Sequence, residues 1–269
     1  MRFITKVIGE SFYILRKNSK LFVPFLIGGL FNALALYLVY LIPQRPFLYV
    51  FGPPVRAFFG EKFLHYPFNL YLLPKLFYYA TSFVSATVGV LMTATAIGMI
   101  RDIYYKKRPL IRTSLFYALR RYFSLFCVWL VVFVLMFTFG KFMRSFKSEG
   151  AIAKLLPYFV YLGIIFIQLI FIYVIPVLVI NNKNIIKSFA EGIAFLRKVF
   201  LPTVTILGLA ILVYLPVFIL KQNLPFLSSV FYPEIIVVIF AIGVFVSFII
   251  DIFVTTVTTF IFLEKKGGG

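Results

Sequence analysis

Long apolar runs alternate with short basic joints along the whole chain. Six runs are long enough to cross a bilayer, whose hydrocarbon core of about 30 Å requires about 20 apolar residues in a helix. We therefore predict six transmembrane helices at about 21–43, 76–100, 122–140, 158–180, 201–220 and 235–263. The runs do not alternate between polar and apolar positions as the strands of a membrane barrel do. The expected fold is an all-α, polytopic helical membrane protein.

The overall composition also indicates that lipid is the solvent of this chain. Of its 269 residues, 62% are hydrophobic and 13% are charged, and the mean hydropathy is +1.04. A soluble domain typically contains about 45–50% apolar and about 25% charged residues. No segment has the composition of a soluble domain, so we expect residues 1–269 to form a single integral membrane domain.

The distribution of positive charge predicts the orientation of the chain. The net charge is +19, and 18 of the 27 Lys and Arg lie in the two terminal segments and in the joints after the second and fourth spans. Basic joints favour the cytoplasmic side. We predict a multi-pass protein of the cell (inner) membrane with both termini in the cytoplasm, where its cations face anionic lipids. No basic stretch is long enough for a nucleic-acid-binding domain, so nucleic acid is not an expected partner.

A short motif recurs before the first, third and fifth spans. Its copies are Leu15-Arg16-Lys17, Leu119-Arg120-Arg121 and Leu196-Arg197-Lys198, and a serine precedes each of them, at Ser11, Ser114 and Ser188. An apolar or aromatic face upstream of each motif predicts an amphipathic helix in the headgroup plane, then a basic corner and a hairpin of spans. We expect three pseudo-repeated units whose basic pairs bind anionic headgroups. The alternative is that every cytoplasmic helix start in a basic membrane protein shares this pattern.

The joint over residues 44–75 is long and rich in proline and aromatic residues. It is too apolar for a solvated loop and too often interrupted by proline for a span. We expect it to lie on the outer interface, with a short helix near residues 54–64. A lid over a cavity is the functional alternative.

Several polar residues fall near the midplane of the predicted bilayer. Asp251 lies in the middle of the sixth run, and ionisable groups at this depth are functional candidates because burying them is costly. A rise of 1.5 Å per residue places Asn32 and Gln168 at a similar depth, and Ser247 and Thr255 share the helical face of Asp251. We predict that these five residues form one buried polar site. The alternative is that each makes a separate interhelical hydrogen bond.

The sequence lacks the residue patterns of catalysis and metal binding. His65 and Cys127 are the only histidine and the only cysteine, and neither has a partner at a useful spacing. The eight carboxylates form no catalytic pair, and no glycine-rich phosphate loop or metal-ligand motif occurs. We therefore expect no enzyme activity, no cofactor and no metal.

Two stretches resemble a group of uncharacterised prokaryotic six-span membrane proteins. They are residues 11–18 before the first span, and residues 176–183 with Ile186-Lys187-Ser188-Phe189 and the third basic motif after them. The group is similar to the membrane domain joined to some glycerophosphodiester phosphodiesterases. The resemblance implies the six-span topology. It implies no hydrolase activity, because the sequence given does not contain the phosphodiesterase catalytic domain.

These observations favour a non-enzymatic function that involves lipids. We expect a lipid-interacting scaffold, a lipid-handling factor or a partner of a membrane enzyme, with anionic lipids bound at Arg16, Lys17, Arg120, Arg121, Arg197 and Lys198. The alternative is a small-solute or ion transporter that uses the midplane site around Asp251. An enzyme embedded in the membrane is the third possibility, and the lack of an acid–base pair weighs against it.

Overall fold

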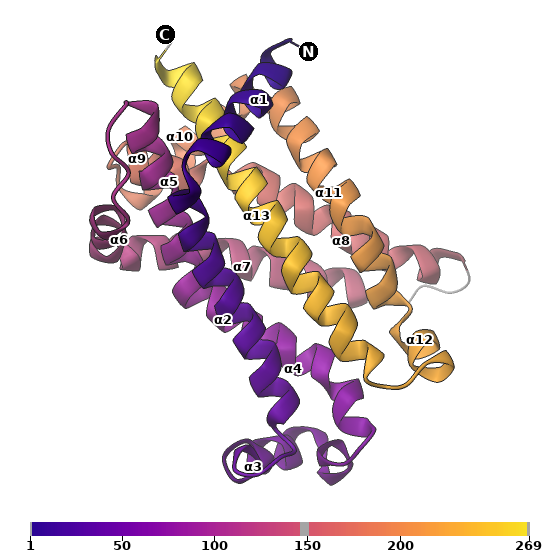
Figure 1. Ribbon diagram of the computed structural model, residues 1–269. Coiled ribbons are helices and arrows are strands. Elements are labelled where there is room, and N and C mark those ends of the chain that lie inside the picture. The colour runs from indigo at the N-terminus through magenta and orange to yellow at the C-terminus, as the bar shows by residue number, and fades with distance from the viewer. Residues whose placement is uncertain (1, 146–150, 268–269) are drawn as a thin grey trace. The chain divides into compact units, whose positions relative to one another are not determined.

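A computed structural model describes residues 2–145 and 151–267, and the described chain contains helices and no strand. In chain order the elements are α1 (Arg2–Lys17), η1 (Ser19–Leu21), α2 (Phe22–Leu41), α3 (Phe47–Phe59), η2 (Glu61–Leu64), α4 (Phe68–Val84), η3 (Ser85–Gly89), α5 (Val90–Tyr104), α6 (Ile111–Arg120), α7 (Tyr122–Ser145), α8 (Ala151–Phe171), α9 (Val174–Ile180), α10 (Ile185–Lys198), α11 (Phe200–Gln222), α12 (Leu224–Val230) and α13 (Ile235–Gly267) (Figure 1). The all-α prediction is confirmed.

Six helical segments of the described chain are long and apolar enough to cross a membrane, as predicted. They are Ser19–Leu41, Phe68–Tyr104, Tyr122–Met143, Leu155–Ile180, Phe200–Gln222 and Ile235–Lys266. The second span begins at Phe68, eight residues before the predicted start, because α4 continues through Pro74. Membrane helices tolerate such a proline, since neighbouring groups satisfy the freed carbonyl. The chain is therefore a multi-pass membrane protein.

The fourth span contains a break that the hydrophobic pattern does not reveal. Between α8 and α9 the chain makes a turn at Ile172 and Tyr173. Pro176 explains its position, because proline has no N–H to donate to the carbonyl four residues earlier and its ring collides with that carbonyl. The carbonyl four residues before Pro176 is that of Ile172.

The joint after the first span is more helical than predicted. The short helix expected near residues 54–64 is replaced by α3, which begins at Phe47, and by the 3₁₀ turn η2. Val55 and Leu64 from this joint pack with Ile42 and Leu72 in one small apolar core. Phe58 of the same joint is 81% exposed, and the expected location of the joint at the outer interface stays a prediction.

The described residues divide into two compact units. The first contains residues 1–24, 90–208 and 254–269, and the second contains residues 25–89 and 209–253. The helices α2, α11 and α13 each contribute residues to both units. Because both units are built from the spans themselves, this division does not test the prediction of a single membrane domain over 1–269.

The three predicted amphipathic helices are confirmed as separate helices of the first unit. They are α1, α6 and α10, and each ends at its basic pair. Ser11, Ser114 and Ser188 are 1%, 4% and 0% exposed. The residue four positions after each serine is also buried, namely Leu15, Ala118 and Gly192. Each helix thus buries a stripe of small or apolar residues, while Arg16, Lys17, Arg120, Arg197 and Lys198 at their ends are exposed.

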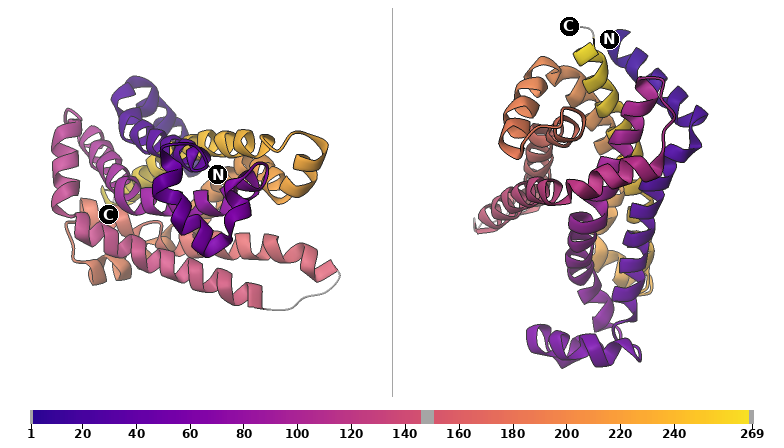
Figure 2. Two further views of the ribbon diagram at one scale, coloured as in Figure 1. Left: turned by 90° about the horizontal axis from the view of Figure 1, so that it is seen from below. Right: turned by 90° about the vertical axis from the view of Figure 1, so that its left-hand side faces the viewer.

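The core of the first unit is formed by α5, α6, α7 and α9. Ile97, Leu125, Val174 and Leu178 belong to one buried apolar cluster, and Trp129 packs against its edge. The helices α7 and α8 run alongside each other (Figure 2). At Gly98 of α5, an added Cβ atom would lie 3.2 Å from Cβ of Ser114, so these two helices approach closely. Small residues permit such approach between membrane helices.

The helix α1 lies against the C-terminal end of α13, and Figure 1 shows the two chain ends at the same end of the picture. Lys6 Nζ donates a hydrogen bond to Glu264 Oε1 at 2.7 Å. Lys265 Nζ lies 4.9 Å from the ring centroid of Phe3. An ion pair and a cation–π contact therefore join the first and last helices of the described chain.

The core of the second unit is formed by α2, α4, α12 and α13. Leu36, Leu70, Leu224 and Ile239 belong to its buried cluster. The rings of Phe77 and Phe240 meet edge to face, with 5.4 Å between their centroids. Apolar and aromatic side chains make up this core, as expected for spans that pack within a bilayer.

Candidate functional site

The predicted basic pairs lie at the ends of α1, α6 and α10, and most of their side chains are exposed. Arg16, Lys17, Arg120, Arg197 and Lys198 are all at the surface. Aromatic rings position two of these cations, since Lys17 Nζ lies 5.7 Å from the ring of Tyr13 and Arg120 Cζ lies 4.4 Å from the ring of Phe116. These cations are therefore accessible to groups from outside the protein.

Arg121 differs from the other five predicted cations because its guanidinium bonds within the chain. It donates to the carbonyl oxygens of Leu178, Asn182 and Lys183, at 3.4, 3.3 and 3.0 Å. Tyr117 Oη donates to Asn182 Oδ1 at 3.0 Å and reinforces the same contact. Arg121 therefore joins the start of α7 to the turn between α9 and α10, and its guanidinium stabilises the fold.

A cavity of about 340 Å³ opens between α9, α10 and the last turns of α13 in the first unit. Three lysines stand at its surface, Lys198 from α10 and Lys265 and Lys266 from α13. Its inner wall is apolar. The other residues that line the cavity are Val177, Asn181, Glu191, Ala194, Phe195 and Phe262.

A buried hydroxyl pair fixes the aromatic wall of this cavity. The rings of Phe195 and Phe262 are in edge contact, with 4.8 Å between their centroids, and Tyr173 packs against both. Tyr173 Oη and Thr203 Oγ1 are 2.7 Å apart and share a hydrogen bond, and both residues are fully buried. The hydroxyl groups behind the wall are therefore satisfied within the protein.

The charge balance of the cavity is positive. Glu191 is the one carboxylate among its described lining residues. Lys183 Nζ lies 3.4 Å from Glu191 Oε1, and Asn181 Nδ2 donates to Glu191 Oε2 at 3.2 Å. The oxygen of the same amide accepts a hydrogen bond from Lys266. Lys198 has no ion-pair partner in the described parts of the chain. Glu191 is thus already neutralised, and the three lysines retain their net positive field.

The five residues predicted to form a midplane site are divided between the two units. Asn32, Ser247 and Asp251 belong to the second unit, and Gln168 and Thr255 to the first. Asn32 Oδ1 is buried and has no hydrogen-bond partner among the described atoms. Gln168 Nε2 lies 3.7 Å from Met136 Sδ, a weak contact. The convergence of the five residues stays a prediction.

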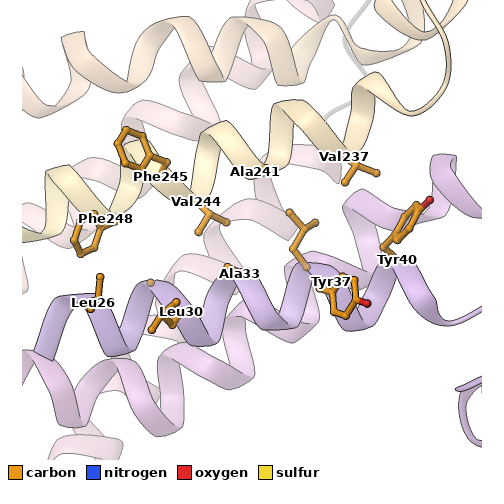
Figure 3. A pocket seen from close by; sticks show the side chains of 12 residues that line it. Leu26, Leu30, Ala33, Tyr37, Tyr40, Val237, Ala241, Val244, Phe245 and Phe248 are labelled. Carbon is orange, nitrogen blue, oxygen red and sulfur yellow. The ribbon is translucent and has the colours of Figure 1, made fainter. Parts of the chain in front are cut away.

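The second unit contains an apolar groove of about 440 Å³ between α2 and α13. Leu26 and Leu30 of α2 face Val244 and Phe248 of α13, and Tyr37 lies toward the other end (Figure 3). No charged side chain lines this groove. It offers apolar contact only, which distinguishes it from the cavity that Lys198, Lys265 and Lys266 surround.

Sequence reasoning did not identify Lys265 and Lys266 as site residues. In the sequence, both contribute only to the excess of cations that predicts the cytoplasmic side. Their position after the last apolar run gives no indication that they meet α10, since that contact joins segments far apart in the sequence. Arg197 and Lys198 were identified through the repeated motif, but only Lys198 lines the cavity.

Comparison with models of protein families, with curated proteins and with solved structures finds no significant match. The resemblance of residues 11–18 and 176–198 to the membrane domain of some glycerophosphodiester phosphodiesterases therefore stays a prediction. The function has to be argued from the site itself.

Proposed function

We propose that this protein is a lipid-interacting membrane protein that binds the anionic headgroup of a phospholipid in the cavity between α9, α10 and α13. The observation that carries the proposal is the group of Lys198, Lys265 and Lys266 around an aromatic wall. On this proposal the protein acts as a scaffold, a lipid-handling factor or a partner of a membrane enzyme, with both termini in the cytoplasm of a cell whose inner membrane it spans.

The chemistry of the cavity matches a phosphodiester attached to an apolar body. Each ammonium group supplies three hydrogen-bond donors and one charge, while phosphate oxygens are strong acceptors. A basic residue near an anionic membrane surface contributes about 1 kcal/mol to the attraction. Phe195 and Phe262 offer an apolar surface for the carbon atoms next to the headgroup. A volume of about 340 Å³ falls in the range of small-ligand sites, about 300–1,000 Å³.

The exposed cations at the ends of α1 and α6 extend the same interaction over the predicted cytoplasmic surface. Arg16, Lys17 and Arg120 would contact headgroups without a cavity, so their contribution is electrostatic and depends on ionic strength. Arg121 is not assigned to lipid, because its guanidinium donates to three backbone carbonyls. This limits the headgroup proposal to Arg16, Lys17, Arg120, Arg197 and Lys198, with Lys265 and Lys266 added.

The test is lipid retention by the purified protein. Native mass spectrometry in nanodiscs containing equal amounts of dioleoyl phosphatidylglycerol and dioleoyl phosphatidylcholine compares wild type with the triple variant Lys198→Gln/Lys265→Gln/Lys266→Gln. We expect wild type to retain the anionic lipid selectively and the triple variant to lose that selectivity, because the net positive field of the cavity is removed.

The matched control removes three exposed cations from another joint on the same predicted side. Lys106, Lys107 and Arg108 follow α5, and all three are exposed. Their replacement by Gln changes the net charge equally and leaves the cavity intact. Equal loss of selectivity in both variants would show a diffuse charge effect and refute a defined site. Unchanged selectivity in the cavity variant would refute the headgroup proposal outright.

Transport through the predicted site around Asp251 is the second candidate function, and it is favoured by Asn32 Oδ1, which is buried and has no hydrogen-bond partner in the described parts of the chain. A buried acceptor that lacks a donor is costly, so a bound solute or ion would stabilise it. Proton flux into proteoliposomes loaded with a pH-sensitive dye, driven by a potassium diffusion potential, tests this candidate. We expect Asp251→Asn to abolish a flux that wild type supports. Equal flux in the two proteins would exclude a proton-coupled role for Asp251.

A further inference from the structure

The side chain of Lys221 occupies an unusual position in the second unit. It lies one residue before the C-terminal end of α11, where a lysine normally extends its charge toward the interface. Its Nζ instead donates a hydrogen bond to Tyr214 Oη at 3.0 Å, and Tyr214 precedes Lys221 by seven positions. Seven residues correspond to about two helical turns, so the hydrogen bond is made toward the interior of the span.

Contacts with α13 indicate the same depth independently. Lys221 Nζ lies 4.7 Å from the ring centroid of Phe240 and 5.5 Å from that of Tyr214. It would lie 2.9 Å from a Cβ atom added at Gly243. Phe240 and Gly243 are five and eight residues beyond the start of α13, which corresponds to about 8 and 12 Å along that helix. The ammonium therefore lies within the apolar part of the spans.

The absence of a side chain at Gly243 creates the space for this amine. An added Cβ would meet Lys221 Nζ at 2.9 Å, Lys221 Cε at 3.1 Å and Val217 Cγ1 at 3.3 Å. Gly243 itself is buried. Gly243 thus accommodates a cation from the neighbouring helix.

The bonding of the ammonium is incomplete. A lysine ammonium has three donors, and Tyr214 Oη accepts one of them, while two ring faces contribute cation–π attraction. No carboxylate in the described parts of the chain forms an ion pair with Lys221. The residue is half-buried rather than sealed, so an external group can reach it. An amine at this depth calls for an anion to compensate its charge.

We propose that Lys221 is the anchor of a binding site for the oxyanion of an amphiphile, a carboxylate on a long hydrocarbon chain. The ammonium would bind the carboxylate, Tyr214 would orient the ammonium, and the hydrocarbon chain would lie against the apolar surface of the spans. Val217 and Phe218, four and three residues before Lys221 on the same helix, are 3% and 8% exposed, so the helix next to Lys221 is buried and apolar, and the hydrocarbon chain would contact other, exposed side chains of the spans. Such surroundings disfavour a small hydrated anion, which would lose its water without gaining apolar contact. This site goes beyond the headgroup cavity, because it belongs to the other unit and to the opposite predicted side of the membrane.

The first arm of the test needs no variant. Native mass spectrometry of the purified protein measures the retention of palmitate against that of methyl palmitate, which has the same chain without the charge. We expect wild type to retain palmitate about tenfold better, as one charged hydrogen bond implies. Equal retention of the two compounds would overturn the proposal. Retention of acetate or inorganic phosphate at the same concentration as palmitate would overturn the assignment to an amphiphile.

The second arm locates the site. Lys221→Met removes the charge and keeps a long unbranched side chain, so palmitate retention should fall to the level of methyl palmitate. Lys221→Arg keeps the charge and should preserve palmitate retention. The matched control is Lys75→Met, because Lys75 Nζ also lies 4.7 Å from a ring centroid, that of Phe59, but its side chain is exposed. Retention that survives Lys221→Met, or that is lost equally in Lys75→Met, would overturn the assignment to Lys221.

Discussion

Substitution of Gly192 by alanine gives a sharp test of the packing between α10 and α9. An added Cβ at this buried position would lie 3.0 Å from Val174 N, 3.1 Å from Val174 Cα and 3.1 Å from Val174 Cγ2. Two of these atoms belong to the backbone of α9, so no rotamer change can relieve the contact. Overpacking of this kind typically costs about 1–3 kcal/mol, and the involvement of backbone places Gly192→Ala at about 2 kcal/mol.

The structure provides both the reporter and the controls for this measurement. The lone tryptophan, Trp129, packs against the cluster that contains Val174, so its fluorescence during thermal unfolding in detergent reports on the same core. At Gly98 the facing atoms are the Cβ and Oγ of Ser114, at 3.2 and 3.3 Å. Because one of them is a movable side-chain oxygen, Gly98→Ala should destabilise less than Gly192→Ala.

Gly208 supplies the opposite control, since nothing lies within 4 Å of an added Cβ there. Alanine in an open helical position is about 0.5–1 kcal/mol more favourable than glycine. The expected order of melting temperatures is Gly208→Ala at or above wild type, then Gly98→Ala, then Gly192→Ala. If the melting temperature of Gly192→Ala equals that of wild type, the close approach of α10 to α9 is refuted.

Three further changes test individual contacts of the first unit. The hydrogen bond to Glu264 raises the pKa of the Lys6 ammonium above its ordinary 10.5. The stabilising contribution of this contact should therefore be present below about pH 10.5 and be lost as the pH rises further. Above this pH the melting temperature should fall more steeply in wild type than in Lys6→Met, and equal slopes would contradict the prediction. Tyr173→Phe should cost about 0.5–1.5 kcal/mol, because it removes the hydrogen bond between the two buried hydroxyls while Thr203 Oγ1 keeps its hydrogen bond to the Val199 carbonyl, and an unchanged melting temperature would exclude a stabilising contribution from the Tyr173 hydroxyl. Arg121→Ala should destabilise by about 1.5–3 kcal/mol through lost charged hydrogen bonds, whereas Arg120→Ala should stay within about 0.5 kcal/mol, and equal unfolding of the two variants would contradict this difference.

Much of the fold follows directly from the hydrophobic pattern. The six spans and the amphipathic helices were predictable because lipid requires long apolar runs and the interface requires mixed faces. The break before α9 could also be predicted, because Pro176 removes the hydrogen bond to the carbonyl of Ile172. The extension of α4 through Pro74 was not, because whether a membrane helix continues through proline depends on its neighbours.

The candidate sites could be predicted only in part from the sequence. The motif identified Lys198, but its partners Lys265 and Lys266 join it only through contact between α10 and the end of α13. Arg121 was expected to meet lipid, and the structure uses its guanidinium for three backbone carbonyls. The direction of the Lys221 side chain depends on the space left at Gly243 of another helix. Such placements are set by tertiary packing, which no local pattern encodes.

The contact between Lys6 and Glu264 has a consequence for the order in which the protein assembles. Its two residues are 258 positions apart. At about 5–20 residues per second, synthesis of the intervening chain takes roughly 10–50 s. During that time α1 has emerged from the ribosome, but its final partner does not yet exist. Its amphipathic surface, with Phe12 and Tyr13 outward, is free to rest on the membrane until the last span is inserted and closes the contact. The contact that holds α1 against α13 therefore forms late, although α1 is made well before α13.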